Sequence, residues 1–115
     1  MDLSRTLLLY AALGIVLAVP RLVHAGTDDL VVALHAQEQR FEPSELHVPA
    51  NQPFTIHVTN DETTAIEFES FELHRERVVQ PGATITVLMP ALTPGTYKFF
   101  DDFHRDTPEG AIVVK

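Results

Sequence analysis

Short stretches in which apolar and polar residues alternate recur along the chain after residue 28. In the clearest case, Phe54, Ile56 and Val58 alternate with threonine and histidine. A period of two, with β-branched and aromatic residues, is typical of a half-buried β-strand. On this pattern we expect strands at 29–37, 53–60, 83–90, 95–102 and 110–115.

Residues that favour turns separate these stretches. Proline fixes φ near the value that many turns need, while glycine and asparagine tolerate positive φ. No segment after Ala25 carries a long period of 3.6 residues, so we expect no helix there. About seven or eight short strands at such spacing predict an all-β fold, an antiparallel β-sandwich. The turn formers are Pro43, Pro49–Asn51, Asn60–Asp61, Pro81–Gly82 and Pro94–Gly95.

The first 25 residues differ from the rest of the chain. Arg5 precedes an apolar stretch at 6–19, and the segment ends on the small residue Ala25. This layout is typical of a secretory signal peptide. The alternative is a membrane anchor, but the stretch is shorter than the roughly 20 residues of a span, and a proline and an arginine interrupt it. We therefore expect residues 1–25 to be cleaved, leaving 26–115 as one exported domain that does not span a membrane.

The composition narrows the classes of function. Aspartate and glutamate number 16 against 8 lysines and arginines, a net charge of −8. This excess argues against nucleic-acid binding, which needs basic side chains, and it suits cations or a basic partner, although solubility alone would also explain it. The chain has no cysteine, which excludes disulfides and thiolate chemistry.

The run YKFFDDFHRDTPEG places acidic and aromatic residues at the end of one expected strand. Because side chains alternate between two faces, Asp101 points toward the core with Tyr97 and Phe99. Asp102 points outward. A buried carboxylate without a partner is costly, and His104 follows in a loop where it can meet Asp101. The spacing therefore allows the two side chains to meet at one point in space.

The last two expected strands resemble those of cupredoxins, in the segment PGTYKFFDDFHRDTPEGAIVV. Upstream, FEPSELHVPANQPFTIHVTN resembles the early strands of that family. Asp101 stands at the position of the copper-binding cysteine, and His104 stands at that of the histidine that follows it. Glu109, or nothing, replaces the methionine. The resemblance covers roughly Leu30 to Lys115 and implies a Greek-key sandwich. The other matching positions are Pro94, Gly95, Tyr97, Phe99 and Gly110.

The departures from cupredoxins bear on function. A blue-copper site needs a thiolate and two histidines, so electron transfer of that kind is not expected in a chain without cysteine. Near the position of the first histidine the chain has AIEFESFELHRERVVQPG, with Glu67 and Glu69. This segment and FFDDFH resemble the cupredoxin-like proteins of bacterial periplasmic iron-uptake systems. In those proteins carboxylates replace the copper ligands, and a membrane iron permease works beside them.

The resemblance implies that Glu67, Glu69, Asp101 and His104 share one pocket and bind a single iron or copper ion. Carboxylates favour hard cations, imidazole extends the choice to iron and copper, and three negative ligands would balance Fe³⁺. In the alternative without metal, the glutamates lie on a solvated strand edge, the aspartate caps a turn and the histidine is a surface residue. Second-tier candidates for the site are Asp102, Glu109 and His74.

Three functions remain open on the sequence. The favoured one is a periplasmic metal-binding protein that binds, oxidises or delivers iron to a membrane permease and its periplasmic accessory proteins. The second is an enzyme, a small copper-dependent ferroxidase, which would need a second metal or an electron acceptor. The third is a structural or adhesive β-sandwich that binds no metal.

Overall fold

Strands form where the apolar alternation predicts them. In the computed structural model, which describes residues 29–115, β4 buries Phe54, Ile56 and Val58 and exposes His57. These residues contain no helix and so none long and apolar enough to cross a membrane. The predicted signal peptide lies outside them. The strands are β1 (Leu30–Gln37), β2 (Arg40–Glu42), β3 (Glu45–Val48), β4 (Phe54–Asn60), β5 (Ile66–Ser70), β6 (Arg75–Val79), β7 (Thr84–Met89), β8 (Gly95–Asp101) and β9 (Gly110–Val114).

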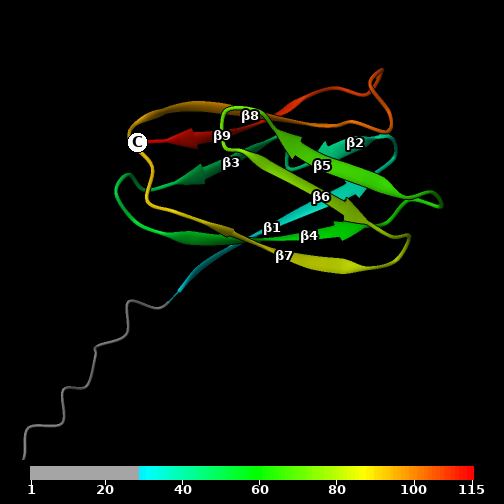
Figure 1. Ribbon diagram of the computed structural model, residues 1–115, viewed down its shortest axis with the longest axis horizontal. Coiled ribbons are helices and arrows are strands. Elements are labelled where there is room, and N and C mark those ends of the chain that lie inside the picture. Colours follow the sequence, from blue (N-terminus) through cyan, green and yellow to red (C-terminus); the bar gives the residue numbers. More distant parts are fainter. Residues whose placement is uncertain (1–28) are drawn as a thin grey trace, which may run out of the picture.

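The strands form two sheets that pack as layers (Figure 1). One sheet has the order β2-β1-β4-β7 and the other has the order β3-β9-β8-β5-β6. The all-β sandwich is therefore confirmed, but the pairing is not antiparallel throughout. β1 pairs with β4 in parallel, and β3 pairs with β9 in parallel. The parallel pairs arise because the chain crosses to the other sheet between their members, and so returns in its original direction.

Three phenylalanine rings from both sheets form the centre of the core. The Phe41 ring lies 5.0 Å from that of Phe99 and 6.5 Å from that of Phe68, both edge-on. The Phe68 and Phe99 rings lie 5.2 Å apart. Edge-to-face pairs at such distances add about 0.5–1.5 kcal/mol beyond the burial of apolar area. Since Phe68 and Phe99 belong to β5 and β8, the core fixes which faces of these strands point inward.

Asn60 is a buried polar side chain that ties together the turns beyond β4. Its amide donates hydrogen bonds to the carbonyl groups of Thr64 and Val79, at 2.8 and 2.9 Å. Its carbonyl oxygen accepts one from the N–H of Glu62 at 2.8 Å. Satisfying a buried amide in this way offsets its desolvation. Asn60 thereby holds the loop that leads into β5.

Two arginines of β6 bridge the open side of the sandwich. The guanidinium of Arg75 donates to the carbonyl oxygen of Leu88 through Nε and Nη2, at 3.1 and 3.0 Å. Arg77 donates to the carbonyl oxygen of Thr86 at 3.4 Å. Both acceptors belong to β7, the edge strand of the other sheet. The two arginines of the sequence HRER (74–77) thus join the two sheets.

The alternation along β8 agrees with the sequence prediction. Phe99 and Asp101 are buried, and Tyr97 packs against the core. Asp101 pairs with Phe68, whose side chain belongs to the core, so both point inward. Phe100 lies on the opposite face but is also buried, because its ring packs 5.0 Å from that of Phe71. Asp101 is therefore the inward member of the aspartate pair.

Gly110 gives a test of the packing between β8 and β9. It pairs with Phe99, and a Cβ added there would overlap the Phe99 ring. We expect Gly110→Ala to lower the free energy of unfolding by about 1–3 kcal/mol, because the ring must move within a filled core. Urea denaturation measures this loss.

Thr96→Ala, at an exposed position of β8, serves as the control and should change stability by less than about 0.5 kcal/mol. The double variant Gly110→Ala/Phe99→Leu should lose less than the sum of its single variants, since the smaller side chain relieves the overlap. An unchanged urea midpoint for Gly110→Ala would contradict this account of the packing.

Candidate metal centre

Asp101 and His104, called here the inner pair, meet at one end of the sandwich. Asp101 Oδ2 lies 2.7 Å from His104 Nδ1. Asp101 Oδ1 accepts hydrogen bonds from the backbone N–H groups of Glu67 and Phe103, at 3.0 and 3.1 Å. Because an ionised carboxylate only accepts hydrogen bonds, Nδ1 of His104 carries a proton. The carboxylate of Asp101 thus has three donors and is not an unpaired buried charge.

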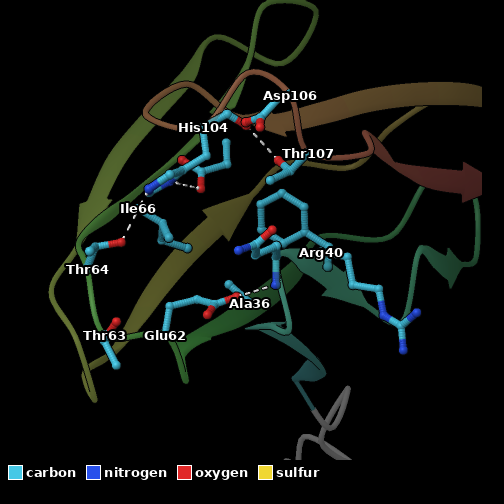
Figure 2. Close-up of a pocket in the computed structure, with 12 residues that line it drawn as sticks. Ala36, Arg40, Glu62, Thr63, Thr64, Ile66, His104, Asp106 and Thr107 are labelled. Atoms are coloured by element: carbon cyan, nitrogen blue, oxygen red, sulfur yellow. Dashed lines mark hydrogen bonds and ion pairs between the residues drawn. The ribbon is translucent and has the colours of Figure 1, made fainter.

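The far side of the imidazole faces a cavity of about 290 Å³. Figure 2 shows His104 directed at Thr64, and the Nε2 to Oγ1 distance is 3.2 Å. The cavity is lined by both residues of the inner pair, but its other polar side chains are mixed in type. The lining residues are Ala36, Gln39, Arg40, Phe41, Glu62, Thr63, Thr64, Ile66, Asp101, His104, Asp106 and Thr107.

Three glutamates gather on the outer face of the five-stranded sheet. Glu69 of β5 lies opposite Glu76 of β6 in the strand register, and Glu67 is two positions from Glu69 on the same face. One carboxylate oxygen from each residue can be chosen so that all three lie within 4.8 Å of one another. We call these three residues the outer carboxylate cluster. Their spacing is short enough for one cation to contact all of them.

Glu67 is the buried member of the outer carboxylate cluster, with 6% of its surface exposed. Among the hydrogen bonds of residues 29–115, none runs from an N–H group to its carboxyl oxygens, and these oxygens lie beside the carboxyl groups of Glu69 and Glu76. Burial raises the pKa of Glu67 to about 7, and a hydrogen bond with Glu76 and repulsion from it act in the same direction. The site therefore holds a carboxylate that prefers a proton or a cation as its partner.

The pKa of Glu69 is raised as well, first by burial and then by repulsion from Asp102 and Glu76. A hydrogen bond with Glu67 and the nearby charge of Arg105 act in the opposite direction. Several carboxylates that raise one another's pKa values form a strongly negative patch. A bound cation would relieve this repulsion.

The structure does not bring the four predicted ligands into one pocket. Asp101 and His104 lie on the inner side of the sheet, whereas Glu67 and Glu69 lie on its outer face. The error concerns β5: Phe68 lies opposite Asp101 and points into the core, so the residues on either side of it must point away. The prediction of a single site formed by all four residues is therefore wrong. The two pairs of residues lie on opposite faces of the same sheet.

The three second-tier candidates do not lie together either. Asp102 follows Phe100 by two positions on the outer side, and its charge raises the pKa of Glu67 and Glu69. His74 lines an open hollow of about 510 Å³ with Glu69 and Glu76. Glu109 pairs instead with Lys98 at 3.5 Å. Asp102 and His74 thus lie beside the outer carboxylate cluster, and Glu109 belongs to a surface ion pair.

Glu76 is the cluster member that the sequence interpretation missed. It lies in HRER (74–77), a segment where only His74 was expected near the site. The signal was available: a tight turn after Ser70 makes β5 and β6 a hairpin, and such a hairpin pairs Glu69 with Glu76. Pairing two like charges directly across a hairpin is unfavourable in itself, so Glu76 is a candidate ligand.

A blue-copper centre does not fit the residues of the inner pair. Such a centre needs a thiolate and two imidazoles, but residue 101 is an aspartate and the chain has no cysteine. His104 is the histidine that lines the cavity. The oxygens of Asp101 are also engaged with three donors. In this arrangement Asp101 orients the imidazole and closes the turn after β8.

Comparison with known sequences places these features in a family. The cupredoxin-like domain family matches residues 8–114. The uncharacterized protein RP394 of Rickettsia prowazekii is 38% identical over 85 residues, which cover 74% of this chain and 68% of that protein. The family match begins upstream of the predicted cleavage site after Ala25 and includes all nine strands.

Solved structures of other proteins share this fold. Auracyanin A, a "blue" copper protein of Chloroflexus aurantiacus, is 18% identical with a TM-score of 0.61, and covers 76% of this chain and 99% of its own. A purple cupredoxin of Nitrosopumilus maritimus is 17% identical with a TM-score of 0.55, and covers 76% of this chain and 100% of its own. At these identities the likeness concerns the fold.

The hydrogen bonds of Asp101 predict its effect on stability. Asp101→Ala leaves the N–H groups of Glu67 and Phe103 without their acceptor, so we expect the free energy of unfolding to fall by about 2 kcal/mol or more. Asp101→Asn should cost less, because its amide oxygen can still accept from both. Urea denaturation of the two variants, with Asp106→Asn as an exposed control, measures the difference. Equal stability of Asp101→Ala and wild type would contradict a structural role.

The raised pKa of Glu67 predicts how the stability of the metal-free protein depends on pH. The pKa is about 7 in the folded chain against an ordinary 4.5, so the contribution of Glu67 is fully present below pH 4.5 and is lost as the pH rises through about 7. Glu67→Gln removes this loss. We expect the variant to match wild type near pH 4 and to be more stable at pH 8, in thermal melts with chelator present.

Glu109→Gln carries the same chemical change at an exposed ion pair and should show no such rise with pH. A stability difference between Glu67→Gln and wild type that stays constant from pH 4 to pH 8 would show that Glu67 ionises normally.

Proposed function

Because the chain belongs to the family of cupredoxin-like domains, we propose that it is a metal-binding protein whose metal ligands are carboxylates. Its site is the outer carboxylate cluster of Glu67, Glu69 and Glu76, and its cargo is iron. The observation that carries this proposal is the close approach of three carboxylates, within 4.8 Å, around the buried Glu67. Acidic residues on a surface are common, but a mostly buried glutamate whose carboxyl group lies against two other carboxyl groups is not.

The ligand chemistry favours a hard cation. Carboxylate oxygens suit magnesium, calcium, manganese and iron, whereas copper(I) prefers sulfur. Three glutamates balance the charge of Fe³⁺. Glu76 is exposed and Glu69 is half-buried, so the ion would enter and leave from the solvent side. An accessible site with few protein ligands suits a protein that carries iron and passes it on.

We place this activity in bacterial iron uptake, beside a membrane permease in the periplasm. The support is the resemblance of EFESFEL and FFDDFH to proteins of such systems, and the predicted signal peptide at 1–25. The same glutamates that carry the resemblance belong to the outer carboxylate cluster. Whether iron is oxidised during transfer distinguishes a carrier from the alternative, a copper-dependent ferroxidase. The second alternative, a structural or adhesive sandwich, binds no metal.

An exposed aromatic beside the outer carboxylate cluster is the place where the permease or its accessory protein would dock. Phe71 exposes 65% of its surface and packs on Phe100. It lines the same open hollow as Glu69 and Glu76. An apolar side chain next to the ligands lets a partner exclude water while it takes the metal. Phe103 is a second exposed aromatic, on the loop after β8.

Metal titration tests the proposal. We expect chelator-treated wild type to keep a cooperative melt and to bind one equivalent of Fe²⁺ (anaerobically) or Fe³⁺ (supplied as citrate) in isothermal titration calorimetry. Glu67→Gln should weaken binding at least tenfold, which is about 1.4 kcal/mol. Asp101→Asn should change affinity little, because its carboxylate lies on the other side of the sheet.

Glu109→Gln is the matched control and should bind like wild type. Binding that survives Glu67→Gln but fails in His104→Ala would move the site to the inner pair. Oxygen consumption on adding Fe²⁺ to copper-loaded protein would favour the ferroxidase. Absence of any stoichiometric iron or copper would favour the metal-free sandwich.

A further inference from the structure

Asp102 continues the row of acidic residues on the outer face. In the register of β5 and β8, Phe68 lies opposite Asp101 and Glu69 lies opposite Phe100, so Asp102 comes next to Glu67. The N–H of Asp102 donates to the carbonyl oxygen of Glu67 at 3.0 Å, which fixes the two backbones together. Side chains directly opposite each other on one face of a sheet have Cβ atoms about 5 Å apart. Asp102 is not one of the three residues whose carboxylate oxygens lie within 4.8 Å of one another, but a turn of its side chain away from Arg105 brings its carboxylate toward a cation bound to Glu67.

Arg105 is the counter-ion of Asp102 in the structure. Its Nη1 lies 3.0 Å from Asp102 Oδ1, and its guanidinium carbon lies 4.3 Å from the centre of the Phe100 ring. Phe100 stands opposite Glu69, and the charge of Arg105 lowers the pKa of Glu69. One arginine thus contacts the aspartate and lies close to the glutamates.

We propose that Asp102 is a fourth carboxylate ligand of the metal, and that Arg105 is a tethered cation that holds this ligand until the metal replaces it. The inference rests on the proposed function, because it concerns the same outer carboxylate cluster. When the cation binds Glu67, Glu69 and Glu76, Asp102 turns from the guanidinium to the ion. Arg105 remains over the Phe100 ring. On release of the metal the ion pair forms again.

The exchange needs little free energy. The Arg105 side chain is 60% exposed and that of Asp102 is 41% exposed, and ion pairs of that kind contribute about 0–1 kcal/mol. The backbone of Asp102 is already held by Glu67, so only side chains move. The ring of Phe100 gives the guanidinium a second contact after it leaves the carboxylate. A buried ion pair at this place would resist the same exchange.

The ion pair between Arg105 and Asp102 also bears on the repulsion among the carboxylates of the metal-free protein. Without Arg105, four carboxylates would face one another across two pairs of strands, and their repulsion would oppose folding of the metal-free chain. The arginine reduces this repulsion through Asp102, whereas Glu67 is surrounded by the carboxyl groups of Glu69 and Glu76. A cation would therefore meet carboxylates at Glu67 and a weak, replaceable ion pair at Asp102.

A double-mutant cycle on Fe²⁺ affinity tests the exchange, with anaerobic calorimetry of the full domain. Asp102→Asn should weaken binding at least about tenfold, since a ligand is lost. Arg105→Gln should strengthen it about two- to fivefold, the range of an exposed ion pair. In the Asp102→Asn background, Arg105→Gln should strengthen binding clearly less, because the arginine no longer competes for that ligand and only its charge still acts on the cluster.

The controls carry the same charge changes on the other side of the sheet: Asp106→Asn and Arg40→Gln, at two residues of the inner cavity. Both should bind like wild type. If Arg105→Gln strengthens binding equally in wild type and in Asp102→Asn, the arginine acts only through its charge and does not compete with the metal for Asp102. The proposed exchange is then refuted. If Glu67→Gln abolishes binding but neither Asp102→Asn nor Arg105→Gln changes it, the inference fails and the proposed function stands. If wild type binds no iron, both fail.

Discussion

The hydrogen bonds of Asp101 set the geometry on which both faces of the five-stranded sheet depend. β5 and β8 share only two paired positions, and Asp101 Oδ1 extends their contact by accepting the N–H of Glu67. The same oxygen closes the turn at Phe103, and Oδ2 holds His104. A buried carboxylate with three donors is stable only in one arrangement. That arrangement fixes the start of β5, and with it the direction in which Glu67 points.

The acceptor role of Asp101 also explains how a cupredoxin-like domain can keep its fold without a thiolate at this position. A metal held between strands would join the loop after β8 to the neighbouring strand, and here hydrogen bonds join them. The loop is then fixed by the protein itself. The metal chemistry that we propose uses the opposite face of the same strand, where the ligands are oxygens and the solvent has access.

The sequence predicted the sandwich and the inward direction of Asp101, because both follow from a period of two within single strands. It failed at Glu67 and Glu69, since their direction depends on how β5 pairs with β8 and on which side Phe68 packs. Periodicity places residues on a common face but does not say which face is buried when glutamates and phenylalanines alternate. Glu76 was missed for a related reason: its position depends on a hairpin register, which becomes visible only when HRER is treated as a strand. The parallel pairs of β1 with β4 and β3 with β9 are long-range features that no local pattern encodes.

The arginines that donate to the carbonyl groups of β7 affect how this protein can meet other chains. An edge strand with free backbone groups invites another strand to add to the sheet, which is one route to fibres and also one mode of peptide recognition. In β7 the carbonyl groups of Thr86 and Leu88 are already engaged by Arg77 and Arg75. A visiting strand would first have to displace two guanidinium groups. At this edge, recognition by backbone pairing is therefore disfavoured, and selection among partners falls to the side chains of the acidic face beside it.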